Sequence, residues 1–199
     1  MDFWDRFAGL YDFAESFNDN VYRRMTNLTT MLIPFGAKVL DCAAGTGELS
    51  LAAAKKAGHV ICTDNSERML AVAREKAETL GATNISFGKC DIYSINQPDD
   101  TFDTVIAGNV LHLLDDPEAA LKELCRVTKP GGKILLPCFT TYGSNSKLLK
   151  LYKKIGYKGR EFTPNGYCRM IANTHCGRVK GKIIPGKIPC CYVVIYKKQ

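Results

Sequence analysis

Apolar and polar residues alternate along the middle of the chain with two different periods. Short runs that are apolar almost throughout are typical of strands buried on both faces of a parallel sheet. Between these runs, apolar residues recur every three or four positions, as they do in helices that cover a sheet. The predicted strands are residues 38–42, 59–64, 84–90, 102–108 and 133–139. The predicted helices are residues 47–57, 66–80 and 116–127.

Local signals mark where these helices begin and end. Ser66 is a suitable N-cap and Gly81 a suitable stop for one helix, and Asp116 with Pro117 opens the next. The turn residues 129–132 then lead the chain into the fifth strand. Strands that alternate with helices at short intervals predict a Rossmann-like, doubly wound α/β fold, with a mostly parallel sheet and helices on both faces.

The two ends of the chain depart from this alternation. Residues 2–31 carry apolar side chains at helical spacing. In the tail, helical stretches at 146–155 and 163–173 precede two strand-like runs, 178–184 and 189–196. A Pro-Gly turn between those runs predicts a β-hairpin at the sheet edge, which adds one antiparallel strand to a seven-stranded sheet. We expect a single domain, 1–199, made of an N-terminal helical cap (1–35), a core (36–139) and a basic tail (140–199).

The composition fits a globular protein without a membrane span. Hydrophobic residues make up 46% and charged residues 24% of the 199 residues. The purely apolar runs are far shorter than the ~20 residues that a spanning helix needs. The N-terminus, Met1 to Asp5, carries acids and aromatic residues where a signal peptide has a basic start. We therefore expect a cytoplasmic protein.

Cysteine usage predicts reduced thiols. The chain has nine cysteines, an odd number, and no CxxC. Cys42, Cys62, Cys90 and Cys138 stand in apolar, strand-like runs, where cysteine behaves as a small buried hydrophobe. We expect no disulfide framework, and no metal site, because the later Cys and His residues match no zinc spacing.

The formal charge of +7 conceals an asymmetry. Residues 1–139 carry a net charge of −5, whereas 140–199 carry +12 and contain Glu161 as their single acid. Within this tail, 146–160 place apolar residues on one helical stripe and five lysines around it. One interpretation is a peripheral helix on an anionic membrane surface. The alternative is a pocket-covering helix whose lysines are solvated.

The segment 39–50, VLDCAAGTGELS, carries the strongest chemical signal. A strand ends in Asp41, and a loop of small residues leads into a helix. Gly45 and Gly47 let a ligand approach the backbone closely, and the helix start offers free N–H groups. Nicotinamide and flavin enzymes use GxGxxG at this place. Here the loop reads GTGELS after an acid, which would suit a sulfonium amino acid with a free ammonium group.

Polar residues also follow the next three predicted strands. Asp64 is placed to accept hydrogen bonds from two ribose hydroxyls, and Asp91 could face an adenine amino group beside Ile92. Asn109 and His112 follow the fourth strand. Because open α/β sheets bind ligands at the carboxyl ends of their strands, we expect these side chains to border one crevice.

Together these motifs resemble the class I S-adenosylmethionine-dependent methyltransferases, in particular the group similar to the ubiquinone/menaquinone-biosynthesis C-methyltransferases. The likeness covers about residues 3–139 and rests on WDRFAGLYD, DCAAGTGE, CTDNSERML, CDI, FDTVIAGNVLHLL and LKELCRVTKPGGKILL. It implies an enzyme whose cofactor is S-adenosylmethionine, with S-adenosylhomocysteine as product, bound in the core 36–139. The tail departs from every pattern that we can match, so the resemblance says little about the acceptor.

The resemblance also implies residue roles. The glycine loop would line the methionine part of the cofactor, Asn109 would lie under the sulfonium, and Tyr11 would close over the site. Ala43 replaces a glycine that is usual in the family, and we expect it to fit with φ below zero. The cofactor-binding residues that we expect are Tyr11, Asp41, Ala43, Gly45, Gly47, Asp64, Asn65, Met69, Cys90, Asp91, Ile92 and Asn109.

Methyl transfer from a sulfonium needs alignment, exclusion of water and, for some acceptors, removal of a proton; it needs no metal. His112 is the first candidate for a base and Tyr11 the second. The alternative is that His112 is a core histidine satisfied by a backbone carbonyl. A base role predicts that His112→Ala lowers turnover far more than cofactor affinity.

We expect the acceptor to be a small, lipophilic molecule, such as a quinone precursor or a lipid. One alternative is nucleic-acid methylation, which the basic tail favours. The residues after the fourth strand, GNVL, nevertheless lack the Pro-Pro-aromatic motif of amino methyltransferases of nucleic acids, and Cys138 after Pro137 would pack in its strand rather than act as a nucleophile. The other alternative is a non-catalytic domain that binds the cofactor.

Overall fold

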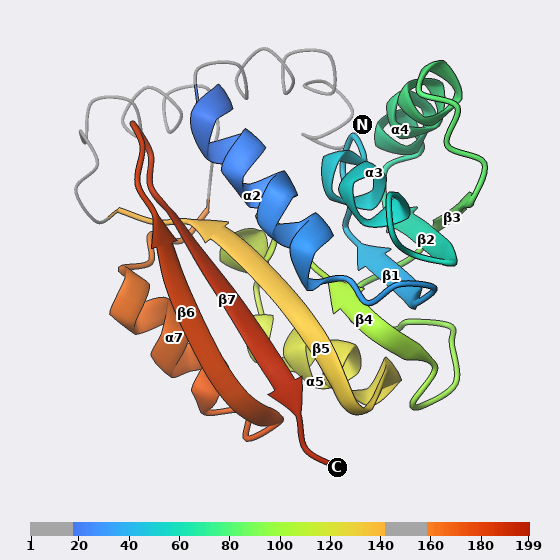
Figure 1. Cartoon of the computed structure of the whole chain (residues 1–199). Coiled ribbons are helices and arrows are strands. Elements are labelled where there is room, and N and C mark those ends of the chain that lie inside the picture. The colour runs from blue at the N-terminus through green and yellow to red at the C-terminus, as the bar shows by residue number, and fades with distance from the viewer. Residues whose placement is uncertain (1–17, 142–158) are drawn as a thin grey trace.

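The computed structural model describes residues 18–141 and 159–199, which form a seven-stranded sheet in the order β3-β2-β1-β4-β5-β7-β6 (Figure 1). The strands are β1 (Lys38–Cys42), β2 (His59–Asp64), β3 (Ile85–Lys89), β4 (Phe102–Ile106), β5 (Thr128–Phe139), β6 (Gly177–Ile184) and β7 (Cys190–Lys197). The helices are α2 (Asp19–Leu32), α3 (Glu48–Ala54), α4 (Glu67–Thr79), α5 (Pro117–Val127) and α7 (Pro164–Ala172), with a 3-10 turn η1 (Leu111–Leu113).

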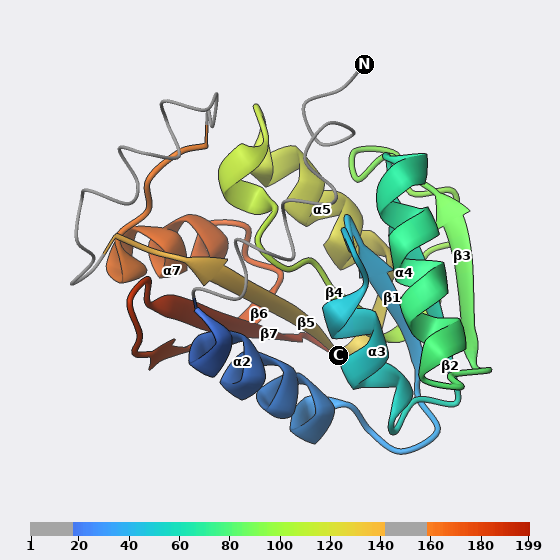
Figure 2. The ribbon, with the colours of Figure 1, turned by 90° about the horizontal axis from the view of Figure 1, so that it is seen from above.

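Helices cover both faces of the sheet, as Figure 2 shows from above. One core cluster joins α2 and α3 to the sheet through residues such as Met25, Val39 and Ala53. The other joins α5 and α7 to the opposite face through Leu40 and Leu121, among others. Because β1 to β4 run parallel, their carboxyl ends lie along one edge of the sheet, where the predicted ligand-binding residues stand.

The predicted order of strands and helices is confirmed for the described residues. β1 and β2 have the predicted bounds. The Ser66 hydroxyl accepts a hydrogen bond from the Met69 N–H at 3.3 Å and caps α4, and Asp116 caps α5 in the same way. β7 is antiparallel to both β5 and β6, so it is the one antiparallel strand that the hairpin predicted. The predicted helix 146–155, the stretch 2–17 and Tyr11 lie outside the described residues.

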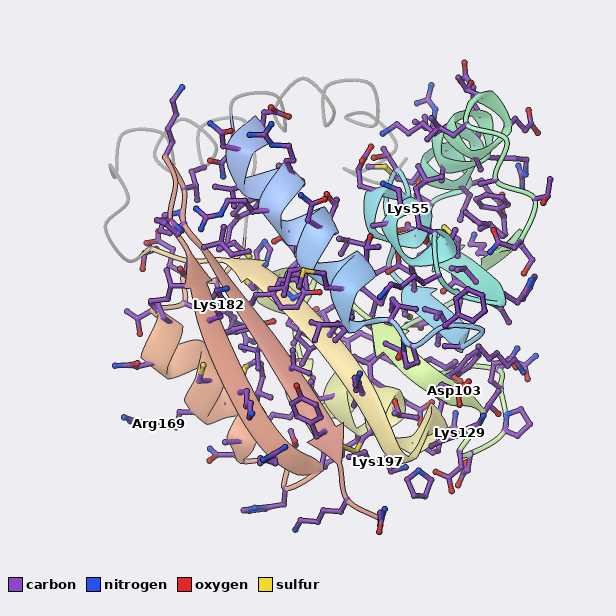
Figure 3. All side chains as sticks on the ribbon, viewed as in Figure 1. Lys55, Asp103, Lys129, Arg169, Lys182 and Lys197 are labelled. Carbon is purple, nitrogen blue, oxygen red and sulfur yellow. A yellow bond between two sulfur atoms is a disulfide. The ribbon has the colours of Figure 1, made fainter. Side chains whose placement is uncertain are left out.

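The fifth strand begins earlier than predicted. β5 starts at Thr128, which pairs with Phe102, and the register shifts before Thr104. The shift accommodates the Pro-Gly-Gly sequence, which the sequence pattern had assigned to a turn ahead of the strand. Lys129 stays in position because its Nζ pairs with Asp103 Oδ1 at 2.6 Å (Figure 3).

The expectation of no disulfide is wrong at one pair. Cys125 and Cys176 are bonded to each other, with their Cα atoms 6.2 Å apart. Cys125 lies in the last turn of α5 and Cys176 follows α7, and these two helices cover the same sheet face. The two cysteines come close only because α7 packs beside α5, and no local sequence pattern predicts that packing. Cys42, Cys62 and Cys138 are buried free thiols, as predicted, whereas Cys90 is only half-buried.

None of the helices in the described ranges is both long and apolar enough to cross a membrane.

Candidate cofactor site

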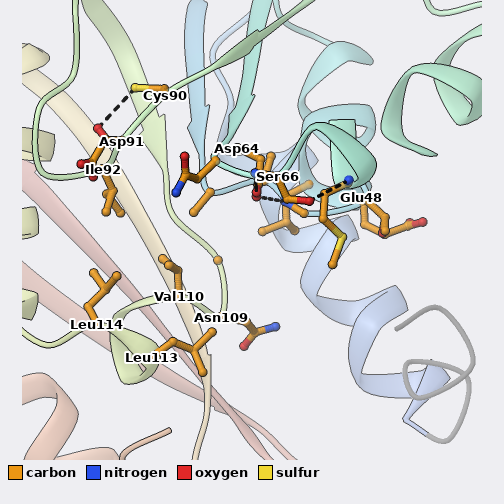
Figure 4. Close-up of a pocket in the computed structure, with 18 of the residues that line it drawn as sticks. Glu48, Asp64, Ser66, Cys90, Asp91, Ile92, Asn109, Val110, Leu113 and Leu114 are labelled. Carbon is orange, nitrogen blue, oxygen red and sulfur yellow. Dashed lines mark hydrogen bonds between the residues drawn. The ribbon is translucent and has the colours of Figure 1, made fainter. Parts of the chain in front are cut away.

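A cavity of about 270 Å³ opens at the carboxyl edge of the sheet, between the loops that follow β1, β2, β3 and β4. Figure 4 shows Asp64 and Ser66 on one side of it, and Asn109, Leu113 and Leu114 on another. The structure brings nine predicted residues to its lining: Ala43, Gly45, Asp64, Asn65, Met69, Cys90, Asp91, Ile92 and Asn109. The convergence that the strand-end pattern predicts is therefore present.

The loop between β1 and α3 turns through three left-handed residues. Ala43 has φ +56°, so the expectation that it would fit with φ below zero is wrong. A left-handed alanine is strained. Gly45 has φ +56° and lines the cavity, whereas Gly47, at φ +82°, does not line it. A Cβ on Gly47 would come within 2.8 Å of the Ala73 Cβ, so this glycine lets α3 and α4 approach each other.

Asp64 ties this loop to the next one. Its Oδ2 accepts a hydrogen bond from the Gly45 N–H at 2.8 Å, and its Oδ1 accepts one from the Ser66 N–H at 2.9 Å (Figure 4). Each carboxylate oxygen can accept more than one hydrogen bond, and the side chain borders the cavity. Asp64 can therefore hold both loops while it accepts hydrogen bonds from a ligand's hydroxyl groups.

The residues after β3 form the next part of the wall. Asp91 Oδ1 accepts the Tyr93 N–H at 2.9 Å, which closes a tight turn. The side chain of Ile92 is buried and anchors the turn in the core between the sheet and α5. A hydrogen bond with the Cys42 thiol lowers the pKa of the Cys90 thiol to about 7. The apolar surface at Ile92, beside the carboxylate of Asp91, suits a flat ring that carries an amino group.

Asp41 lies behind the cavity rather than in its lining. Its side chain is fully buried, and its Oδ2 accepts a hydrogen bond from the Ser50 hydroxyl at 2.7 Å. Its Oδ1 has no hydrogen-bond partner among the described residues. Burial raises the pKa of this carboxyl from 3.8 to about 7. A buried carboxylate oxygen without a donor is expensive, so this group is suited to receive a cation.

His112 also lies outside the cavity lining. Its Nδ1 is 3.3 Å from the Cys138 Sγ, and burial lowers the pKa of the imidazole to about 4. The Cys138 thiol is fully buried, and burial raises its pKa well above the usual value, which agrees with the packing role predicted for it. A base role for His112 stays a prediction.

The depressed pKa of His112 predicts an effect of pH on stability. The folded imidazole stays neutral to about pH 4, whereas the unfolded one takes up a proton near 6.5. Its contribution to stability is therefore lost as the pH falls through this window, by about 2 kcal/mol between pH 7.5 and 4.5. His112→Gln should lack this loss, so its difference from the wild type in free energy of unfolding should shrink at low pH. His59→Gln, on the exposed end of β2, is the control. If the difference in free energy of unfolding between His112→Gln and the wild type were the same at both pH values, the depressed pKa of His112 would be refuted.

Some lining residues were missed by the sequence analysis. Tyr22 and Met25 reach the cavity from α2, and Leu113 and Leu114 reach it from the turn after β4. Tyr22 also packs edge-on against Phe139, with ring centroids 5.4 Å apart. For Tyr22 and Met25 the helical spacing predicted only an apolar helix face, and the position of α2 across the sheet edge shows that this face borders the cavity.

A sheet of this strand order, with β7 antiparallel beside β5 and an acid-bordered cavity at the carboxyl edge, defines a class I S-adenosylmethionine-dependent methyltransferase. Residues 35–162 match the family model described as "Methyltransferase domain", and the chain belongs to that family. The cofactor of this methyltransferase domain is S-adenosylmethionine.

Two curated relatives carry quinone-related names. The demethylmenaquinone methyltransferase of Shouchella clausii is 41% identical over 115 residues, which cover 56% of this chain and 49% of the relative. The ubiquinone/menaquinone biosynthesis C-methyltransferase UbiE of Cellvibrio japonicus is 38% identical over 127 residues, covering 62% of this chain and 51% of the relative. The matched part of this chain thus spans about half the length of these relatives.

Solved structures share the fold at low identity. An S-adenosylmethionine-dependent methyltransferase from Thermotoga maritima superposes with a TM-score of 0.77 at 20% identity, over 98% of each chain. Phosphoethanolamine N-methyltransferase 2 of Haemonchus contortus, in complex with S-adenosylmethionine, superposes with a TM-score of 0.71 at 17% identity, over 87% of this chain and 53% of its own.

The described residues fit this cofactor. The unpartnered oxygen of Asp41 is an anionic site behind the glycine loop, and the cofactor carries an ammonium group. Asp64 has acceptor capacity for the ribose, and the turn at Asp91 has an apolar surface for the adenine. When bound, the cofactor supplies an electrophilic methyl group on a sulfonium.

Proposed function

We propose that the enzyme transfers the methyl group to a small, lipophilic ring compound of the quinol type. The observation that carries this proposal is the apolar wall at the β4 end of the cavity. Val110, Leu113 and Leu114 form one side of it, and Met25 with the ring of Tyr22 extends it from α2. Such a wall favours an apolar, flat acceptor over a charged one, because a charged acceptor would lose hydration there without gaining a partner.

The cofactor would lie along the three preceding strand ends. Asp64 would hold the ribose, while Cys90, Asp91 and Ile92 frame the adenine. The ammonium group would point toward Asp41, directly or through a water molecule. This orientation carries the sulfonium toward Asn109 and the apolar wall, which supports methyl transfer to an acceptor seated there.

The curated relatives support the acceptor class in part. Their names refer to demethylmenaquinone and to ubiquinone and menaquinone biosynthesis, but the match leaves about half of each relative uncovered. We further propose that the helical cap (1–35) and the tail (140–199) supply the acceptor side, around the core 36–139, within one domain.

An acceptor screen tests the proposal. The protein is incubated with methyl-labelled S-adenosylmethionine and, separately, with a short-chain demethylated naphthoquinol, a demethylated benzoquinol, phosphatidylethanolamine vesicles and total RNA. We expect label in the quinol fractions. Label only in lipid or RNA would contradict the proposal, and label in RNA would favour the nucleic-acid alternative.

We also propose that the basic tail meets an anionic membrane surface that holds the acceptor. Arg178, Lys180 and Lys182 are exposed at alternate positions of the edge strand β6, and no ion pair engages them among the described residues (Figure 3 labels Lys182). The Lys-rich segment 146–160 lies outside the described residues. Each basic residue near anionic headgroups contributes about 1 kcal/mol.

This second proposal predicts binding to vesicles. The protein should cosediment with phosphatidylglycerol vesicles at low salt and be released as salt rises. Changing Arg178, Lys180 and Lys182 together to Ser should weaken this binding, whereas changing exposed Lys55 and half-buried Lys56 on the α3 side should not. A wild-type protein that stays in the supernatant at low salt would end the proposal.

A further inference from the structure

Asn109 is held in an unusual conformation at the end of β4. Its φ is +52°, in the left-handed region that few residues other than glycine adopt. Its backbone N–H donates to the Pro137 carbonyl at 2.8 Å, and its side-chain Oδ1 accepts the Phe139 N–H at 3.1 Å. The residue is therefore fixed to β5 by both backbone and side chain, and strain of this kind gathers at functional positions.

These bonds decide which way the carboxamide faces. The Phe139 N–H is a donor, so the atom that it contacts must be the carbonyl oxygen of Asn109 and not the nitrogen. The Nδ2 group of Asn109 therefore points away from the Phe139 N–H. No hydrogen bond engages it within the described part of the chain, and the residue lines the cavity (Figure 4).

The residues on either side of Asn109 in the chain lie in apolar surroundings. The preceding residue, Gly108, packs closely against the side chain of Leu49. The following residue, Val110, belongs to the apolar wall. The acids of the cavity, Glu48, Asp64 and Asp91, belong to the segments at the carboxyl ends of β1, β2 and β3 rather than β4. A preorganised N–H donor in an apolar setting favours a ligand that places an acceptor oxygen there.

We propose that Asn109 is a catalytic residue whose Nδ2 group donates a hydrogen bond to an oxygen of the acceptor that is conjugated to the carbon being methylated. This inference rests on the proposed ring acceptor and specifies its chemistry. The acceptor is a phenol or enol, which the donor helps to hold as its anion.

The methyl transfer then needs no protein base at the reacting carbon. As the acceptor's hydroxyl gives its proton to solvent, Asn109 stabilises the resulting oxyanion. An oxygen lone pair re-forms the C=O bond, and the adjacent ring carbon uses its π-electron pair to bond the methyl carbon. The S–CH₃ bond breaks with its electron pair going to sulfur, which becomes a neutral thioether. The ring carbon then loses its proton to solvent, which restores the aromatic ring.

Asn109→Asp is a suitable test because it replaces the donor with a charged acceptor at nearly the same shape. Aspartate tolerates the left-handed backbone and keeps an oxygen for the Phe139 N–H, but it places an acceptor where Nδ2 was. Two bicyclic probes, 1-tetralone and tetralin, differ by one carbonyl oxygen that can only accept hydrogen bonds. Their dissociation constants are measured on the complex with S-adenosylhomocysteine, for the wild type, Asn109→Asp and Asn109→Gly.

We expect the wild type to bind 1-tetralone about 10-fold more tightly than tetralin. The preference should vanish in Asn109→Gly and vanish or reverse in Asn109→Asp, and any loss of affinity for S-adenosylhomocysteine should be smaller than the loss of turnover. Turnover of the quinol acceptor by Asn109→Asp should fall about 10- to 100-fold, mainly in kcat.

Several results would overturn the inference: a wild type without the preference, a preference that survives in Asn109→Asp, or a loss of cofactor affinity as large as the loss of turnover. Because probe binding needs no turnover, the proposed function can fail separately. If no quinol is methylated but the probe preference depends on Asn109, the donor role stands and the acceptor class is wrong.

Discussion

Replacing Asp41 with asparagine is expected to raise the unfolding temperature of the cofactor-free protein at pH 8 while it weakens cofactor binding by at least about 100-fold. The carboxyl is fully buried, and its pKa in the folded protein is about 7. In the unfolded chain it is about 3.9. A raised pKa means that the folded state binds its proton more tightly. The stability that this proton provides is present below about pH 4 and is lost as the pH rises through 7.

The size of the effect follows from the shift. Three pKa units correspond to about 4 kcal/mol at pH 8, where the folded protein must hold a buried charge. For a chain of this size, such a difference corresponds to roughly 8–16 °C in unfolding temperature. Asparagine carries no charge, so the variant escapes this penalty but leaves the ammonium group of the cofactor without its counter-ion.

Thermal unfolding at two pH values checks this prediction, together with calorimetric titration of S-adenosylhomocysteine. At pH 5 the carboxyl is protonated in the folded protein but ionised in the unfolded chain, so the two unfolding temperatures should differ by only about a third of their difference at pH 8. His112 acts in the opposite direction between pH 4 and 6.5, which is why the comparison must be made between variants and not along one pH curve. An equal gap at both pH values, or normal cofactor affinity in Asp41→Asn, would contradict the role of Asp41.

Asp64→Asn is expected to weaken cofactor binding strongly, by about 1,000-fold. The wild-type carboxylate accepts the Gly45 and Ser66 N–H groups, one on each oxygen. An asparagine would turn its NH₂ group toward one of these donors, so one loop would be released, and it would lose an acceptor for the ribose. Each unsatisfied group costs about 1–3 kcal/mol, and the two effects act on the same ligand.

Calorimetry with S-adenosylhomocysteine measures this loss. Glu67→Gln, in the first turn of α4 beside Ser66, is the matched control and should bind normally. Circular dichroism at 20 °C should show both variants folded. If folded Asp64→Asn bound within about 10-fold of the wild type, the ribose site would have to lie elsewhere.

Much of this fold could be predicted because its signals are local. The apolar strands that carry Asp41 and Asp64 at or next to their last residue were predicted with their exact bounds, and the Ser66 cap marked the start of α4. The convergence of the strand-end residues followed from the rule that parallel strands end at one edge. These inferences need only short segments and one topological rule.

What could not be predicted depends on distant contacts. Asp41 and His112 belong to the expected motifs, yet packing of α3 and β5 places both behind the cavity lining. The Cys125–Cys176 disulfide depends on how α7 docks beside α5. The left-handed Ala43 is imposed by the loop that Asp64 holds, and no feature of an alanine in the sequence indicates it.

The central claim, that the strand-end cavity holds the cofactor with its sulfonium toward Asn109, is tested most directly by a crystal structure of the complex with S-adenosylhomocysteine. The account predicts ribose hydroxyls on Asp64, adenine over Ile92, the ammonium group directed to Asp41, and the sulfur atom facing the carboxamide of Asn109. A ligand bound in the opposite direction, or away from these four residues, would contradict it.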